Sequence, residues 1–351
     1  MPICHITRVP VTISPFSGLM PLTARMGVRE ILYRLHWHSL QKRSWRLGNA
    51  VRQWSIRHHG STWSGLIPYW DEMQFLCRLG RTRAPGVAHF LWGEFGAPSK
   101  VVPYHYLGWK VAVGVHCSAR RWDSVWLRPD GYAQADRVVL TSESQRPRVA
   151  RHVPNERIRR IFLGVDAGHF RPPEERARAH GRLRLLLLGN TERDHEFAAR
   201  VAAKLPADRF AWRVRTDSHE QTAYRTVPSV NLLPRLTDEE FLREYQQADV
   251  LAMPMLDSAA NDVILESMAC GTPVMINRVG GVPEYVDPAS NFLLSNDRNV
   301  DEWVEKLLWL EQNRDVAERL RPATRAWAEK FDWAIIADDY RAMYREMLAR
   351  G

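Results

Sequence analysis

Residues 249–286 combine predicted strand, loop and helix segments with an acidic side chain in a way that could do chemistry. The pattern predicts a strand, a polar loop at 257–261, a short helix that carries Glu266, and a second strand followed by Gly280 and Gly281. Unpaired N–H groups and the dipole at the start of a helix attract anions, and a carboxylate accepts hydrogen bonds from sugar hydroxyls. We therefore expect this stretch to bind a phosphate attached to a ribose.

Three further residues lie where a doubly wound sheet would place a ligand. His116 ends the apolar segment 110–116, and ligands of open α/β sheets bind at the carboxyl ends of strands. Arg193 lies in a predicted strand-to-helix loop, where a guanidinium could brace a diphosphate. Gly18 precedes a helical pattern, at the kind of turn that passes under a ligand. The alternatives are a structural histidine bonded to a loop carbonyl, a solvated arginine and an ordinary turn.

The elements that would hold these residues alternate between strand and helix. Apolar or β-prone segments, separated by helix-compatible stretches, occur at 2–13, 87–92, 110–116, 137–142, 184–188, 230–236 and 250–253. This alternation favours an α/β fold with a mostly parallel sheet. Proline pairs and charges at 170–176 predict an exposed connector, and an apolar stripe at helical spacing predicts a last helical region over 325–350.

The composition is that of an ordinary globular protein. The 351 residues are 45% hydrophobic and 25% charged, and a chain of that length can form two domains with separate cores. No apolar run approaches the roughly 20 residues that span a bilayer, and the N-terminus lacks the layout of a signal peptide. The four cysteines are scattered, which favours reduced thiols over a zinc site or a disulfide framework. We therefore expect a cytoplasmic protein.

The net charge of +9 is concentrated in the first part of the chain. Of the 49 Lys/Arg and 40 Asp/Glu residues, 20 and 8 lie in residues 1–150, together with nine of the fourteen tryptophans. Residues 28–59 carry a helical apolar stripe with basic residues on the other faces, which suits a membrane surface with anionic lipids. The alternative is a pair of ordinary surface helices packed on a sheet. Charge without a nucleic-acid-binding motif argues weakly for nucleic acid, which we do not expect as a partner.

The stretch around Glu266 resembles the nucleotide-sugar signature of the retaining glycosyltransferases of family 4, which have the GT-B fold. The segments that carry the resemblance are 266–274 (ESMACGTPV) with Gly280, Gly281 and Glu284, then 164–166 (GVD) with 170–172 (FRP), and 331–333 (FDW). It implies two doubly wound Rossmann-like domains facing across a cleft, with a C-terminal helix that returns to the first. The implied ranges are 1–170 for an acceptor-binding domain, 171–325 for a nucleotide-sugar-binding domain and 326–351 for the returning helix.

The resemblance assigns roles to residues near the predicted phosphate site. Glu266 matches the second glutamate of the family's E-x7-E motif, which holds the ribose hydroxyls of the donor. Ser258 stands where the first glutamate would contact the donor sugar, with Asp257 beside it. Asn261 and Asp262 fall where backbone amides of the family meet the donor phosphate, and either side chain also suits the N-cap of a helix.

The remaining assignments concern both predicted domains. Gly281 belongs to the donor-binding signature. Arg193 is similar in placement to the family's basic residue on the diphosphate, although the usual Lys-Gly after it is absent. His116 matches the strand-end histidine near the sugar, and Gly18 is similar to the glycine-loop position facing the donor phosphates. The resemblance thus makes His116 and Arg193 the catalytic candidates.

These residues imply a hexosyltransferase-type glycosyltransferase that moves a sugar from a nucleotide-sugar donor to a glycan or lipid-linked acceptor. The family implies retention of the anomeric configuration, and no D-x-D motif indicates a metal site, so neither a metal nor a cofactor is expected. The expected setting is surface polysaccharide or glycolipid synthesis at the inner face of the membrane, where the basic first domain would contact anionic lipids. The alternative is a GT-B protein that binds a nucleotide-sugar with little or no transfer, because Ser258 replaces a glutamate.

Overall fold

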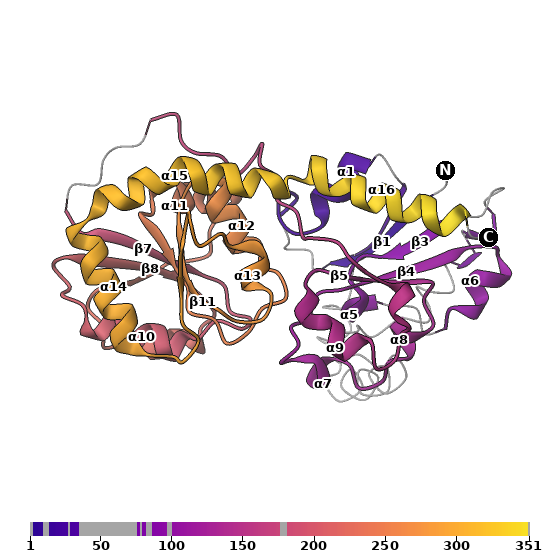
Figure 1. Cartoon of the computed structure of the whole chain (residues 1–351), viewed down its shortest axis with the longest axis horizontal. Helices are drawn as coiled ribbons and strands as arrows, with labels where there is room; N and C mark the ends of the chain where they lie inside the picture. Colours follow the sequence, from indigo (N-terminus) through magenta and orange to yellow (C-terminus); the bar gives the residue numbers. More distant parts are fainter. Residues whose placement is uncertain are drawn as a thin grey trace, which may run out of the picture. The chain divides into compact units, whose positions relative to one another are not determined.

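The chain folds into two compact units (Figure 1). The computed structural model describes residues 3–9, 14–26, 29–34, 76–77, 79–81, 86–96, 100–175 and 181–349. The first unit comprises Met1–Leu163 together with Ala334–Gly351, and the second comprises Gly164–Trp333. Each unit is built around a parallel sheet of its own, which confirms the predicted α/β architecture.

The sheet of the first unit has six strands in the order β2-β1-β3-β4-β5-β6, and every neighbouring pair is parallel. The strands are β1 (Ile3–Val9), β2 (Arg29–Arg34), β3 (Val87–Phe90), β4 (Lys110–Val115), β5 (Arg137–Leu140) and β6 (Ile158–Arg160). All residues of β3 and β5 are buried, because helices cover both faces of the sheet. The strand order reverses beside β1, so the loops after β1 and β3 lie at the switch point where doubly wound sheets bind ligands.

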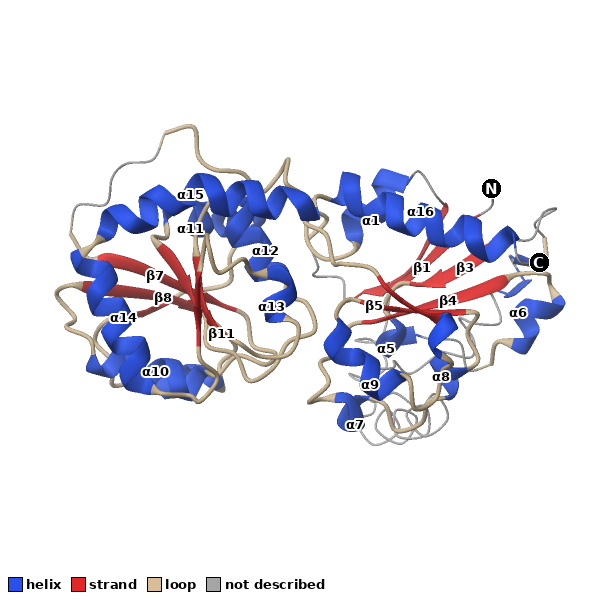
Figure 2. Ribbon diagram, viewed as in Figure 1, coloured by secondary structure: helices blue, strands red, loops and turns tan. Residues whose placement is uncertain are grey.

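Helices lie on both faces of this first sheet (Figure 2). One face is covered by α1 (Met20–Met26) and α16 (Trp333–Ala349), and the short helices on the other are α5 (Gly93–Gly96), α7 (Trp122–Val125), α8 (Asp130–Ala133) and α9 (Arg146–Val149). Helix α6 (Val102–Tyr106) leads into β4. The helix that ends the chain therefore belongs to the same unit as the strand that begins it.

The sheet of the second unit repeats this plan, in the order β12-β11-β10-β7-β8-β9, again with all neighbours parallel. The strands are β7 (Leu183–Leu188), β8 (Phe210–Arg215), β9 (Val230–Leu232), β10 (Val250–Ala252), β11 (Val274–Asn277) and β12 (Phe292–Leu294). The chain moves outward from β7 to β9 and then returns to the other side of β7 as β10. The loops after β7 and β10 consequently flank the switch point of this sheet.

The helices of the second unit form two groups (Figure 2). One group contains α10 (His195–Lys204) and α14 (Val300–Gln312), and the other contains α11 (Asp238–Gln247), α12 (Asp262–Ala269) and α15 (Arg314–Ala328). Helix α13 (Val282–Tyr285) follows β11. Both groups bury apolar stripes against the sheet, so that the central strands β7, β10 and β11 are almost fully enclosed.

The predicted last helical region over 325–350 is two helices, α15 and α16, separated by a 3₁₀ turn at Glu329–Phe331. The break occurs because the backbone there pairs with another segment: Val165 donates to the carbonyl of Phe331 at 2.9 Å and accepts from the N–H of Trp333 at 3.0 Å. The apolar stripe predicted for this region is buried, as expected; its members are Trp333, Ile336, Tyr340, Met343, Tyr344 and Met347.

A polar cluster joins α16 to β1 and β3 within the first unit. The hydroxyl of Tyr344 lies 2.9 Å from Nε2 of His5 and 2.6 Å from Nδ1 of His89. Nδ1 of His5 lies 2.9 Å from the hydroxyl of Thr23 on α1. His5 and His89 are neighbours in the β1–β3 register, and both are buried. His89 on β3 is therefore part of the support for the C-terminal helix.

Residues 29–34, predicted as the start of a basic helix, form β2 instead. They pair in parallel with β1, from Cys4 opposite Arg29 to Val9 opposite Arg34. The helical spacing of apolar residues was misleading there, because pairing with a neighbouring strand outweighs local propensity. Residues 35–59, the rest of the segment proposed for membrane contact, lie outside the described residues. No helix in the described ranges is both long and apolar enough to cross a membrane.

Candidate functional site

Arg193 lies in the loop between β7 and α10, after the carboxyl end of a central strand. Its guanidinium donates from Nε to the carbonyl of Leu188 at 3.0 Å, from Nη1 to the carbonyl of Thr191 at 2.7 Å, and from Nη2 to Oδ1 of Asn261 at 3.2 Å. Gly189 allows this arrangement, because its φ is +94° and a Cβ there would lie 2.9 Å from Nη2 of Arg193. The side chain is therefore held in one orientation.

Arg193 forms no ion pair with a carboxylate among the described residues, although Asp262, Glu266 and Glu192 lie near enough to act on its charge. Its hydrogen-bond partners in this part of the chain are all neutral oxygens. Burial lowers its pKa to about 10, although nearby groups that include Asp262 and Glu266 act in the opposite direction. The guanidinium therefore remains protonated at neutral pH. A partly buried cation of this kind is a favourable partner for an anion.

Helix α12 begins beside this guanidinium. Asn261 occupies the N-cap position, but its side chain makes no capping hydrogen bond, because Oδ1 accepts from Arg193 instead. Asn261 therefore occupies the predicted N-cap position, but its side chain does not bond to the helix as a capping side chain would. The first N–H groups of α12, which starts at Asp262, thus receive no cap from Asn261. The positive end of the helix dipole and a guanidinium meet where the sequence predicted a phosphate.

Glu266 lies on α12 and is 6% exposed. Its Oε2 accepts a 2.6 Å hydrogen bond from the hydroxyl of Tyr245 on α11. Burial, together with the neighbouring Glu266, raises the pKa of Tyr245 well above its usual value, so that the hydroxyl remains a donor. The sequence did not identify Tyr245, because a tyrosine on an adjacent helix carries no motif and only its helical spacing signals burial. This bond orients the carboxylate predicted to hold the ribose.

The loop after β10 and the glycine pair after β11 are bonded to each other. The N–H of Gly281 donates to the carbonyl of Ser258 at 2.7 Å, and the N–H of Ser258 donates to Oδ1 of Asp257 at 2.8 Å. Gly280 has a φ of +47°, and a Cβ there would lie 2.1 Å from the carbonyl oxygen of Ser258. Only glycine fits this position. Two predicted donor-binding residues, Ser258 and Gly281, are therefore in direct contact.

A cluster of polar side chains supports the loop that carries Arg193. His195 lies 2.7 Å from the hydroxyl of Tyr224 through Nδ1 and 3.0 Å from the carbonyl of Gly189 through Nε2. The hydroxyl of Thr216 donates to Oδ1 of Asn190 at 2.7 Å. Sequence reasoning missed these residues, although Asn190 and Thr216 follow adjacent strands and strand-end polar residues are a usable signal.

The two candidates in the first unit lie in the loop after β4 and in the turn before α1. His116 directly follows β4 and is half-buried, and its Nε2–H donates to the carbonyl of Leu91 at 2.8 Å. Burial lowers the pKa of His116, an effect that Glu94 partly opposes. Gly18 lies in the turn before α1 with a φ of +60°, a backbone conformation that favours glycine. The other candidates, Arg193 among them, all belong to the second unit.

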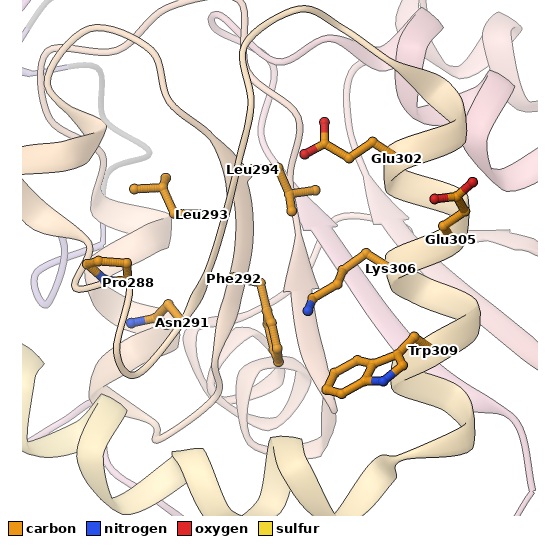
Figure 3. Close-up of a pocket in the computed structure, with 9 residues that line it drawn as sticks. All are labelled: Pro288, Asn291, Phe292, Leu293, Leu294, Glu302, Glu305, Lys306 and Trp309. Atoms are coloured by element: carbon orange, nitrogen blue, oxygen red, sulfur yellow. The ribbon is translucent and has the colours of Figure 1, made fainter.

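A pocket of about 520 Å³ lies elsewhere in the second unit, between the edge strand β12 and α14 (Figure 3). Lys306 places its ammonium 4.2 Å from the ring centroid of Trp309, and Glu302 accepts from the N–H of Ser295 at 3.2 Å. None of the predicted site residues lines this pocket. Within the described ranges, no three His, Cys, Asp or Glu side chains come together to hold a metal ion.

Comparisons with known proteins bear on part of the chain. Residues 214–327 match the family model described as Glycosyl transferases group 1. A D-inositol 3-phosphate glycosyltransferase from Saccharomonospora viridis is 33% identical over 117 residues, which are 33% of this chain and 27% of that protein. Another from Mycolicibacterium paratuberculosis is 28% identical over 237 residues, which are 61% of this chain and 54% of that protein. The chain thus spans about a quarter to a half of the curated relatives it matches.

The similarity to solved structures extends over the whole chain. The Anabaena protein Alr3699/HepE, solved in complex with UDP-glucose, aligns with a TM-score of 0.69 at 12% identity and covers 100% of both chains. The matched family segment contains Ser258, Glu266 and Gly281. It begins at residue 214, after both His116 and Arg193. The chain therefore has the GT-B fold, and its residues 214–327 are similar to a glycosyl transferase group 1 domain.

Proposed function

We propose that this chain is a glycosyltransferase that uses a nucleotide-sugar as its donor. The observation that carries the proposal is the guanidinium of Arg193, which forms no ion pair within the described part of the chain and is bonded to Asn261 at the start of α12, where Asn261 provides no cap. These groups suit a diphosphate, and Glu266 on the same helix suits the hydroxyls of a ribose. The match of residues 214–327 to a glycosyl transferase model supports the same conclusion.

The proposed chemistry follows from where charge develops. Departure of the sugar leaves negative charge on the diphosphate, and Arg193 together with the α12 N-terminus would stabilise that charge without rearranging. We assign this role to protein groups and propose neither a metal nor a cofactor. Retention of the anomeric configuration, which the family resemblance implies, is part of the proposal. His116 would lie near the transferred sugar.

The acceptor is proposed to be a glycan or a lipid-linked group, and the transferred unit a hexose. The basic character of residues 1–150 supports an anionic or membrane-bound acceptor, and the proposed setting is the cytoplasmic face of a membrane during polysaccharide or glycolipid synthesis. Two relatives are named for an inositol phosphate acceptor, which adds a phosphorylated polyol to the candidates.

A transfer assay tests the proposal. Purified protein is incubated with UDP-, GDP- and ADP-hexoses and with lipid-linked, glycan and inositol phosphate acceptors, and release of the nucleoside diphosphate is measured. We expect one donor to be consumed in the presence of one acceptor class, with a product whose anomeric configuration by NMR matches that of the donor. Donor binding with neither transfer nor hydrolysis would favour the alternative of a binding protein, in which the buried Ser258 replaces a needed glutamate.

A further inference from the structure

Residues 91–94, the turn after β3, contact both the backbone and the imidazole ring of His116. The carboxylate of Glu94 accepts the backbone N–H groups of both His116 and Cys117, the latter at 2.7 Å. The indole of Trp92 packs on the imidazole with ring centroids 4.4 Å apart. The carbonyl of Leu91 accepts from Nε2. One short segment therefore determines where this side chain points.

Two glycines let this turn lie directly against the end of β4. A Cβ at Gly114 would lie 2.4 Å from the carbonyl oxygen of Leu91, the group that binds Nε2 of His116. A Cβ at Gly93 would lie 2.5 Å from Cγ1 of Val113 and 2.6 Å from the carbonyl oxygen of Gly114. Larger residues at either position would separate the turn from the strand. The glycines in both segments thus allow the close approach that brings the carbonyl of Leu91 to the ring of His116.

The Leu91 contact selects one tautomer of His116. A carbonyl oxygen only accepts hydrogen bonds, so Nε2 must carry the hydrogen. Burial lowers the pKa of His116, which keeps the ring neutral near pH 7 and leaves a lone pair on Nδ1. Within the described residues, the ring forms no other hydrogen bond. A neutral Nδ1 accepts from a hydroxyl and offers nothing to a phosphate oxygen.

We propose that Glu94 is a positioning residue that holds the loop after β4, so that His116 keeps Nε2–H on Leu91 and presents Nδ1 as an acceptor for a sugar hydroxyl. The carboxyl group of Glu94 is fully buried, and its Oε1 accepts both backbone N–H groups, which fixes it against the start of the loop after β4. The ligand part of this inference rests on the proposed function, whereas the tautomer does not. Glu94 acts through His116 and touches no substrate itself.

The first test needs no ligand. Nitrogen-15 NMR of the full chain with labelled histidine reports which ring nitrogen of His116 carries the hydrogen, and His116→Gln assigns the signal. We expect Nε2–H in the wild-type protein. An Nδ1–H tautomer, or exchange between both forms, would overturn the proposal whatever the variants do. Because neither donor nor acceptor is present, this result is independent of whether the chain transfers sugars.

The second test compares Glu94 with a matched carboxylate at the other end of β4. Asp136 accepts the backbone N–H of Val111 at 2.7 Å, so it also anchors β4 but lies far along the strand from His116. In Glu94→Ala we expect tautomer exchange at His116 and a loss of about 100-fold in kcat with the donor KM nearly kept. Glu94→Gln retains an acceptor oxygen and should restore both.

The matched variant Asp136→Ala should lower the melting temperature without changing the tautomer or kcat. Equal losses of kcat in Glu94→Ala and Asp136→Ala would show that Glu94 only stabilises the strand, and would overturn the proposal. If Glu94→Ala does not fold, Gly114→Ala displaces the same Leu91 carbonyl and should give the same tautomer exchange. An unchanged tautomer in a folded Gly114→Ala protein would contradict the inferred contact.

Discussion

The guanidinium of Arg193 donates its hydrogen bonds to carbonyl and amide oxygens, which orient it, while the nearby Asp262 and Glu266 act on its charge without forming an ion pair with it among the described residues. A residue that served only stability would be expected to pair with a carboxylate, because burying an unpaired cation is costly. The structure also turns the side chain of Asn261 away from the helix that it could cap. Both features fit the proposal that a diphosphate binds between the loop after β7 and the start of α12.

Replacing Arg193 by Met should therefore weaken nucleoside diphosphate binding by at least about tenfold, which corresponds to about 1.4 kcal/mol. The physical reason is the loss of charge-assisted hydrogen bonds to the diphosphate. Isothermal titration measures the change. Arg200→Met is the matched control, because Arg200 is an exposed arginine on the neighbouring helix α10. An Arg193→Met variant that binds as tightly as the control would remove Arg193 from the site.

At the ribose position, Glu266→Ala should weaken donor binding far more than Ser258→Ala. Glu266 presents a carboxylate oriented by Tyr245, whereas Ser258 contacts Gly281 through its backbone, which alanine preserves. We expect at least about a tenfold loss for Glu266→Ala, from lost hydrogen bonds to the ribose, and less than about threefold for Ser258→Ala. Competition against a fluorescent nucleotide gives both affinities. Similar losses in the two variants would invalidate the motif alignment.

Individual residues differ in how far the sequence predicts them. The hydrophobic pattern was enough to place Arg193 in a strand-to-helix loop and His116 at a strand end, and the structure bears out both positions. Their partners were not, because Leu91, Leu188 and Thr191 act through backbone carbonyls that leave no trace in residue type. The bond from Arg193 to Asn261 joins positions 68 residues apart and depends on the order of the strands.

At the scale of elements, α16 is held on its sheet by a polar cluster as well as by its apolar stripe. Tyr344 bridges His5 on β1 and His89 on β3. Burial lowers the pKa of His5 to about 3 and that of His89 well below its usual value, the latter also because of the nearby His5. Both rings are therefore neutral in the folded protein. The helical period predicted the burial of Tyr344 but carried no information about these partners.

This cluster predicts that the free energy of unfolding decreases in mild acid. In the unfolded chain a histidine binds a proton below about pH 6.5, whereas the folded protein excludes that proton until about pH 3 for His5. Stability should be complete above pH 6.5 and should decline as the pH falls from 6.5 toward 3, by about 2 kcal/mol per histidine at pH 5. Urea unfolding of the full chain at a series of pH values measures the decline.

The control for this experiment is His219→Gln, since His219 is exposed on the second unit. This variant should lose stability with pH as the wild-type protein does. His5→Gln should show a shallower decline between pH 6.5 and pH 5, because it removes one of the buried histidines that exclude a proton in the folded protein. A decline as steep as in the wild-type protein would rule out His5 as a source of the pH dependence.

Helices and strands were predicted well where the local hydrophobic pattern was clear. They were predicted poorly where hydrogen bonds to a distant segment outweighed that pattern. Strands such as β3, β4, β5, β7 and β10 are apolar runs between turn residues, and their parallel arrangement followed from alternation with helices. Strands β6, β8 and β12 were not predicted, because arginines interrupt the first two and the third is only three residues long. Residues 29–34 have helical spacing yet pair with β1, and residues 329–332 interrupt a helical stripe because Val165 bonds to their backbone. Such pairing involves distant residues, so a local pattern cannot reveal it.

At the scale of the whole molecule, the chain passes from the first unit to the second near Leu163 and returns near Trp333. The two passing segments are bonded to each other through Val165 and Asp332. Arg325 on α15 donates to the carbonyls of Ala167 and Phe170 at 2.9 and 2.7 Å. The segments at which the chain enters and leaves the second unit are thus held together by hydrogen bonds within that unit.

Gly164→Ala should destabilise this brace. A Cβ at Gly164 would lie 2.4 Å from the indole of Trp333, which is fully buried and cannot move aside, so we expect a loss of about 2 kcal/mol from overpacking. Gly168→Ala is the control, because a Cβ there would meet only the tip of Asp166 at 3.3 Å. Chemical denaturation compares the two, and equal stability would contradict the close packing at Gly164.

The most direct test of the account is titration of the 351-residue chain with UDP, GDP and ADP by calorimetry. If the Arg193 and Glu266 site binds the nucleotide part of a donor, one of these diphosphates should bind with a stoichiometry of one. The matching monophosphate should bind at least about tenfold more weakly, because it lacks the second phosphate that Arg193 and α12 would hold. Absence of binding by all three diphosphates, or equal affinity for monophosphate and diphosphate, would contradict the central claim.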